Sequence, residues 1–190
     1  MAGPRSYGAI AAIAVGIGVL TLDQVSKALV VAQLSGHQPV VLFAGLVSLS
    51  LVRNPGAAFS IGTSFTAVFA LVEAGVVVII LRVSRRLRSW LWTIALGLLL
   101  GGAAGNLADR LFRSPGPLRG YAVDCIKLDF FAPWFNLADS AIVLGAVLLV
   151  LASVSGLRID GTRAPHSAQA VRRAARNEET TPTPPGGSAS

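Results

Sequence analysis

Four stretches of apolar residues constrain this 190-residue chain more than any other feature of its sequence. They run over about 7–34, 65–81, 90–107 and 135–157. Each is near the ~20 residues that an α-helix needs to cross the hydrocarbon core of a bilayer. Only 13% of the residues are charged, and soluble domains carry about twice that fraction. The sequence therefore predicts an all-α integral membrane protein with four transmembrane helices.

Arginine residues flank these stretches and predict their orientation. One arginine precedes the first stretch, a cluster lies within 82–88, and a third group follows residue 157. Positive charge accumulates on the cytoplasmic side of membrane proteins, so we expect both termini to be cytoplasmic and segments 35–64 and 108–134 to face outward. The net charge of +7 would also suit a nucleic-acid-binding protein. Because the charge sits beside apolar spans, we expect no nucleic-acid partner.

The outward segments and the C-terminal segment have their own compositions. Residues 40–43 and 46–52 are rich in β-branched residues, which favours short strands in a small β-rich outward-facing segment. The segment after residue 157 holds arginine, alanine, threonine, proline, glycine and serine with few large apolar residues. We expect a membrane domain over 1–157 and a disordered cytoplasmic tail over 158–190.

Several polar residues lie within or beside the apolar stretches, where they are energetically unfavourable and often functional. Asp23 and Lys27 are four residues apart in the first stretch. This spacing allows an ion pair on one helix face, although a direct substrate role remains an alternative. Asn106, Asp109 and Arg110 end the third stretch after a run of glycine and alanine, where a local ion pair is the structural alternative.

Two further aspartates could form a pair of carboxylates, and an asparagine lies near them in the sequence. Asn136 and Asp139 begin the fourth stretch, and Asp124 precedes them in an outward loop or strand. Asp139 lies about one turn inside the expected helix start, so a capping role fits it poorly. Two carboxylates held close together cannot both ionise easily, which allows one to act as a base while the other donates a hydrogen bond. Glu73, in the middle of the second stretch, has no evident role.

Five segments, in this order, resemble the motifs of bacterial lipoprotein signal peptidase (signal peptidase II), an intramembrane aspartic protease. They read DQVSK at 23–27, RNPGAAF at 53–59, GGAAGNLADR at 101–110, VD at 123–124 and FNLAD at 135–139. The resemblance covers about residues 15–150. It departs from the family at Cys125, where an aromatic residue is frequent.

The resemblance implies an aspartic endopeptidase with Asp124 and Asp139 as its catalytic pair. Its substrate would be a diacylglyceryl-modified prolipoprotein, cut before the lipid-bearing cysteine at the outer leaflet of the bacterial cell membrane. We expect a monomer in contact with membrane lipid, without a metal or cofactor. The residues implied to bind substrate or support the catalytic pair are Asp23, Lys27, Asn54, Gly56, Asn106, Asp109, Arg110 and Asn136.

Two other functions are compatible with parts of the sequence. A small transporter or ion pathway would also use intramembrane carboxylates, but it would more often place them at the bilayer midplane. A thiol hydrolase could use Cys125, the single cysteine, but no histidine lies near it in the sequence. A catalytic thiol generally needs an adjacent base, so the aspartic protease is the favoured prediction.

Overall fold

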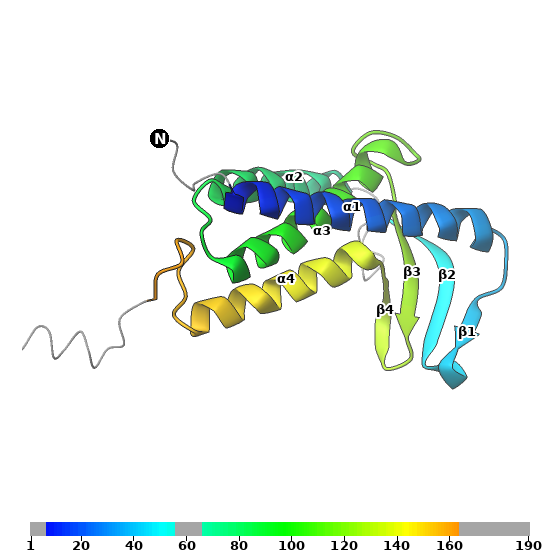
Figure 1. Ribbon diagram of the computed structural model, residues 1–190. Coiled ribbons are helices and arrows are strands. Elements are labelled where there is room, and N and C mark those ends of the chain that lie inside the picture. The colour runs from blue at the N-terminus through cyan, green and yellow to red at the C-terminus, as the bar shows by residue number, and fades with distance from the viewer. Residues whose placement is uncertain (1–6, 56–65, 164–190) are drawn as a thin grey trace, which may run out of the picture.

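Four long helices dominate the computed structural model, which describes residues 7–55 and 66–163 (Figure 1). Each is long and apolar enough to cross a membrane, as the sequence predicts. The third continues five residues beyond its predicted end at Leu107, so that Asp109 and Arg110 lie within the helix. The helices are α1 (Tyr7–Leu34), α2 (Thr66–Ser84), α3 (Trp90–Phe112) and α4 (Leu137–Val154).

The most buried of these helices is α3, which packs against the other three. Small residues make these close approaches possible, as is common where helices pack within a membrane. Gly97 and Gly101 face α1 at Val15 and Val19, whereas Gly102 faces α4. A side chain at any of these glycines would collide with the neighbouring helix.

A four-stranded antiparallel sheet lies at one end of the helix bundle (Figure 1). Its strands, in spatial order, are β1 (Val40–Leu42), β2 (Val47–Asn54), β3 (Ala122–Leu128) and β4 (Phe131–Phe135). The first two strands were predicted. The fourth was missed: residues 131–134 were assigned to the outward segment without a strand, and Phe135, the last residue of the strand, was assigned to the fourth span.

The opposite end of the bundle contains an apolar core cluster and the start of the C-terminal segment. A core cluster there contains Ala12, Leu87 and Leu96. The carbonyl of Ile159 accepts hydrogen bonds from the backbone N–H groups of Arg88 and Ser89. The ordered chain therefore continues beyond the expected boundary at residue 157, and the remainder of the predicted tail, 164–190, lies outside the described residues.

Gly101→Ala should destabilise the bundle, because the added Cβ would lie 2.6 Å from the carbonyl oxygen of Gly16 on α1. Overpacking of this kind lowers the unfolding free energy by about 1–3 kcal/mol. Gly75→Ala on α2 is the matched control, because nothing lies within 4 Å of the added Cβ. Thermal unfolding in detergent would measure both variants, and equal midpoints would contradict the close packing of α1 and α3.

Candidate active site

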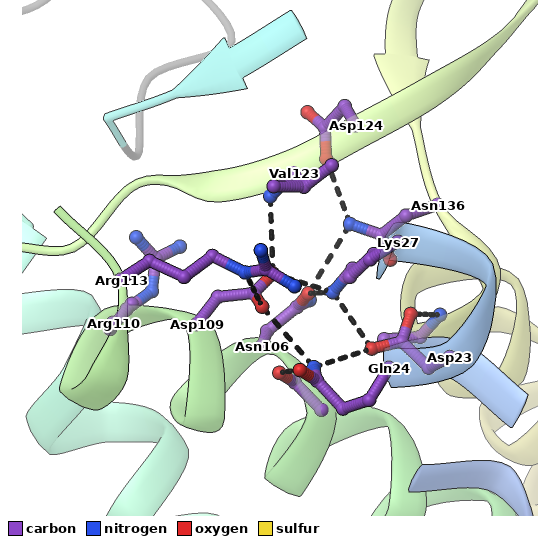
Figure 2. Close-up of polar contacts among 12 residues, drawn as sticks. Asp23, Gln24, Lys27, Asn106, Asp109, Arg110, Arg113, Val123, Asp124 and Asn136 are labelled. Carbon is purple, nitrogen blue, oxygen red and sulfur yellow. Dashed lines mark hydrogen bonds and ion pairs between the residues drawn. The ribbon is translucent and has the colours of Figure 1, made fainter. Parts of the chain in front are cut away.

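The ammonium group of Lys27 lies at the centre of a polar network between α1 and α3 (Figure 2). Its Nζ atom is 2.8 Å from a carboxylate oxygen of Asp23, 2.8 Å from one of Asp109 and 3.1 Å from the amide oxygen of Asn106. A lysine has three N–H donors, so each has an acceptor. The Lys27 side chain is fully buried. The predicted Asp23–Lys27 ion pair is confirmed, and its burial indicates a structural role.

The two carboxylates that bind Lys27 also hold the neighbouring elements. Asp23 accepts a hydrogen bond from the backbone N–H of Ala138 at the start of α4, with a distance of 3.0 Å. Asp109 accepts one from the backbone N–H of Val123 in β3, with a distance of 3.1 Å. The network around Lys27 therefore attaches both α4 and β3 to the helix pair α1–α3.

Arg110 points away from this network and pairs with Glu73 of α2. Its Nε atom is 3.0 Å from each oxygen of that carboxylate, and its guanidinium lies over the ring of Phe69. Asp109 instead pairs with Arg113, four residues further along α3. The local pair of Asp109 with Arg110 does not form, and Arg110 supplies the partner that the sequence did not reveal for Glu73.

Asp124 lies on β3 and accepts two amide hydrogen bonds. One of its oxygens is 2.8 Å from Nδ2 of Asn54 on β2, and the other is 2.8 Å from Nδ2 of Asn136. Burial raises the pKa of Asp124 to about 6, with a further increase from the carboxylate of Asp139 and opposing effects of the two amides. Asp124 therefore keeps a proton to a higher pH than an ordinary aspartate.

Asp139 lies in the first turn of α4 and forms a reciprocal capping pair with Asn136. The side chain of Asn136 accepts from the backbone N–H of Asp139 at 3.0 Å, and Asp139 accepts from the backbone N–H of Asn136 at 3.1 Å. The expectation that capping fits Asp139 poorly was wrong, because α4 begins at Leu137 rather than at residue 135. The other oxygen of Asp139 accepts from Asn106 at 2.8 Å.

Asn136 connects the two acids. Its side-chain amide donates to Asp124 and its backbone N–H donates to Asp139. A cavity of about 220 Å³ adjoins Asp124, and a groove of about 610 Å³ adjoins Asp139. The two carboxylates are thus held by one residue beside two openings that could admit a substrate.

Most of the residues predicted for the site belong to this one hydrogen-bonded network. Arg110 lies beside it, and Gly56 lies outside the described residues. Sequence reasoning assigned no role to Gln24 or Arg113, which both bind Asp109. The spacing of Arg113 four residues after Asp109 was a usable signal. The predicted residues in the network are Asp23, Lys27, Asn54, Asn106, Asp109, Asp124, Asn136 and Asp139.

Comparison with known proteins relates most of the chain to one family. Residues 15–155 match the family model described as signal peptidase (SPase) II. The lipoprotein signal peptidase of Rhodococcus jostii is 51% identical over 145 residues, which are 76% of this chain and 73% of that protein. The lipoprotein signal peptidase of Mycobacterium tuberculosis is 49% identical over 148 residues, covering 78% and 73% respectively.

Two solved structures share the fold. Both are titled as bacterial membrane enzyme structures by the in meso method. One is 25% identical with a TM-score of 0.64 and covers 75% of this chain and 92% of its own. The other is 24% identical with a TM-score of 0.63 and covers 75% and 87%.

Lys27→Met should unfold this end of the protein, because it leaves the carboxylates of Asp23 and Asp109 buried without their shared cation. Removal of one partner from a buried ion pair lowers stability by about 3–5 kcal/mol. Lys127→Met is the matched control, since Lys127 is only half-buried and lies 6.0 Å from the ring of Trp134. Thermal unfolding of the two variants in detergent tests this, and a melting point for Lys27→Met as high as that of the control would refute the structural role.

Proposed function

The chain belongs to the signal peptidase II family, and we propose that it removes signal peptides from prolipoproteins by an aspartic mechanism with Asp124 and Asp139 as catalytic residues. The observation that carries this proposal is the shared contact with Asn136, which binds both carboxylates. The raised pKa of Asp124, about 6, supports it, because an aspartic mechanism needs one acid that retains its proton.

The two acids are not equivalent. Asp139 lies in the N-terminal turn of α4, where the helix dipole favours a negative charge. Asp124 holds the proton more strongly than an ordinary aspartate. In the proposed mechanism, Asp139 takes a proton from the attacking water, and Asp124 donates a hydrogen bond to the carbonyl oxygen of the scissile peptide bond. The water oxygen bonds to the carbonyl carbon and gives a tetrahedral intermediate. As this collapses, the C–N bond breaks and the proton held by Asp139 passes to the leaving nitrogen, which departs as the amine.

The environment of Cys125 argues against a thiol mechanism. Burial raises the pKa of its thiol to about 11, with a further increase from the adjacent carboxylate of Asp124. The thiol is therefore protonated near neutral pH and is a poor nucleophile.

The distribution of charge likewise argues against a transport pathway. The Lys27 network binds β3 and the start of α4, which carry Asp124 and Asp139, so both acids lie at the sheet end of the described bundle. The apolar core cluster occupies the other end.

The proposed substrate is a diacylglyceryl-modified prolipoprotein, cleaved before its lipid-bearing cysteine. The relatives named lipoprotein signal peptidase support this substrate class.

We place the sheet end at the outer leaflet of the bacterial cell membrane, with both termini cytoplasmic. The arginines of 82–88 support this orientation, because they lie in the last turn of α2 and in the α2–α3 connection, at the end opposite the sheet (Figure 1). We further propose that the enzyme acts as a monomer and that residues 164–190 are not needed for cleavage.

Asp124→Asn and Asp139→Asn should each reduce cleavage about a thousandfold or more, because asparagine keeps the shape of the side chain but cannot exchange the proton. The double variant should be hardly worse than either single variant, since residues that act as a unit are not additive. Cleavage of a lipidated precursor by purified, folded variants measures this. Asp129→Asn, on the exposed β3–β4 turn, is the control and should retain activity. Near-normal turnover by Asp139→Asn would contradict the assignment.

The pH dependence of kcat/KM should follow the proton on Asp124. Its pKa is raised to about 6, so the active, protonated form is lost as the pH rises through that value. Cleavage should therefore fall on the alkaline side. Asn54→Ala removes a hydrogen bond that lowers this pKa, so the fall should move to higher pH, whereas Asp129→Asn should leave it in place. A shift to lower pH in Asn54→Ala would contradict the proton-donor role of Asp124.

A further inference from the structure

The groove beside Asp139 has two walls of different origin. One wall is a single face of α4, where Ser140, Val143, Leu144 and Val147 follow one another over two turns. The other wall is formed by aromatic residues of β4 and the β3–β4 turn, among them Phe131, Trp134 and Phe135. The rings of Phe131 and Phe135 pack edge to face, with centroids 6.1 Å apart, which stiffens this wall.

The polar groups of the groove gather at one end. Asp139 and Ser140 lie in the first turn of α4, beside the sheet, and the hydroxyl of Ser140 donates to the carbonyl of Asn136. Val143, Leu144 and Val147 continue away from the sheet and are 63%, 52% and 48% exposed. From Asp139 to Val147 the helix advances by about 12 Å. The groove therefore leads from a catalytic carboxylate along the membrane-spanning face of α4.

The cavity beside Asp124 has a different chemical character. It is smaller, about 220 Å³, and its lining is mixed. The polar side chains of Arg53, Asn54 and Asp124 line it together with apolar residues such as Val52 and Pro55. Pro133 and Trp134 of β4 border both this cavity and the groove. A substrate bound between the two acids thus meets a surface with polar side chains near Asp124 and an almost wholly apolar surface beyond Asp139.

We propose that the groove between β4 and α4 binds the acyl chains of the diacylglyceryl group on the substrate cysteine. This inference rests on the proposed function, in which the lipid-bearing residue directly follows the scissile bond. Neighbouring Cα atoms are about 3.8 Å apart, so the glyceryl group must lie next to the catalytic pair, where the groove begins.

The chemistry of the walls favours acyl chains over the signal peptide as the occupant. A peptide segment carries a backbone N–H and carbonyl at each residue, and leaving these without partners in an apolar environment is costly. Acyl chains have no such groups and gain from apolar contact. The cavity at Asp124 is the more suitable surface for the peptide backbone, because Arg53 and Asn54 provide polar side chains there.

Val143→Phe should test the groove by narrowing it, and Val150→Phe is the matched control. Both valines lie on the exposed side of α4, but only Val143 lines the groove. Two precursors that differ only in acyl length, palmitoyl and butyryl, would be cleaved by each purified enzyme. For Val143→Phe, the ratio of kcat/KM for the long-chain to the short-chain precursor should fall roughly tenfold. This is the change expected when the acyl chain loses contact for about two methylene groups.

The control Val150→Phe should keep the ratio of the unsubstituted enzyme. An unchanged ratio in Val143→Phe, or an equal fall in both variants, would overturn the groove assignment. These outcomes are distinct from failure of the proposed function. If the proposed function were wrong, the unsubstituted enzyme would cleave neither lipidated precursor, and the groove assignment would then be wrong as well.

Photochemical cross-linking provides a second test that does not depend on turnover or on the folding of Val143→Phe. A precursor whose acyl chain carries a diazirine would be bound to Asp124→Asn and irradiated, and the labelled residues identified by mass spectrometry. We expect adducts at Val143 and Val147 in excess over Val150. A free diazirine phosphatidylcholine should label all three positions alike. If the phosphatidylcholine labelled the groove and the acyl chain of the precursor did not, the proposal would be refuted.

Discussion

The buried ammonium of Lys27 is the interaction on which the rest of the structure depends. A charge removed from water is stable only with close partners of opposite sign and complete hydrogen bonding. Lys27 meets this requirement through Asp23, Asp109 and Asn106, which come from α1 and α3. The lysine therefore fixes the relative position of the two helices at the end where Asp124 and Asp139 lie.

Each residue that binds Lys27 also reaches an element that carries Asp124 or Asp139. Asp23 binds the start of α4, Asp109 binds β3, and Asn106 donates to Asp139 itself. In a membrane, helices gain little from the hydrophobic effect when they associate. Small residues allow α3 to approach its neighbours closely, but apolar packing alone would permit sliding. The directional bonds around Lys27 specify which register of the helices is the native one.

The sequence predicted the elements better than their contacts. Four apolar stretches of membrane-spanning length were sufficient for the helices, and the spacing of Asp23 and Lys27 was sufficient for their ion pair. The hydrogen bond between Glu73 and Arg110 joins residues 37 apart in the chain, and no local sequence pattern predicts such a contact. The strand Phe131–Phe135 was missed because aromatic residues suit both a strand and the end of a membrane span.

Asp139 illustrates why a capping role and the proposed catalytic role are hard to separate from the sequence. Helix capping by Asn136 and Asp139 uses one oxygen of each side chain. The remaining oxygen of Asp139 receives the amide of Asn106, and the remaining amide of Asn136 is directed at Asp124. The bonds that start α4 therefore also set the position of both acids. A helix terminus gives the site its rigidity, because the carboxylate of Asp139 cannot rotate without breaking the cap. The bonds that cap α4 are thus the same bonds that hold the two proposed catalytic acids. Burial is the main cause of the raised pKa of Asp124, and the carboxylate of Asp139, which the helix start holds in place, adds to it.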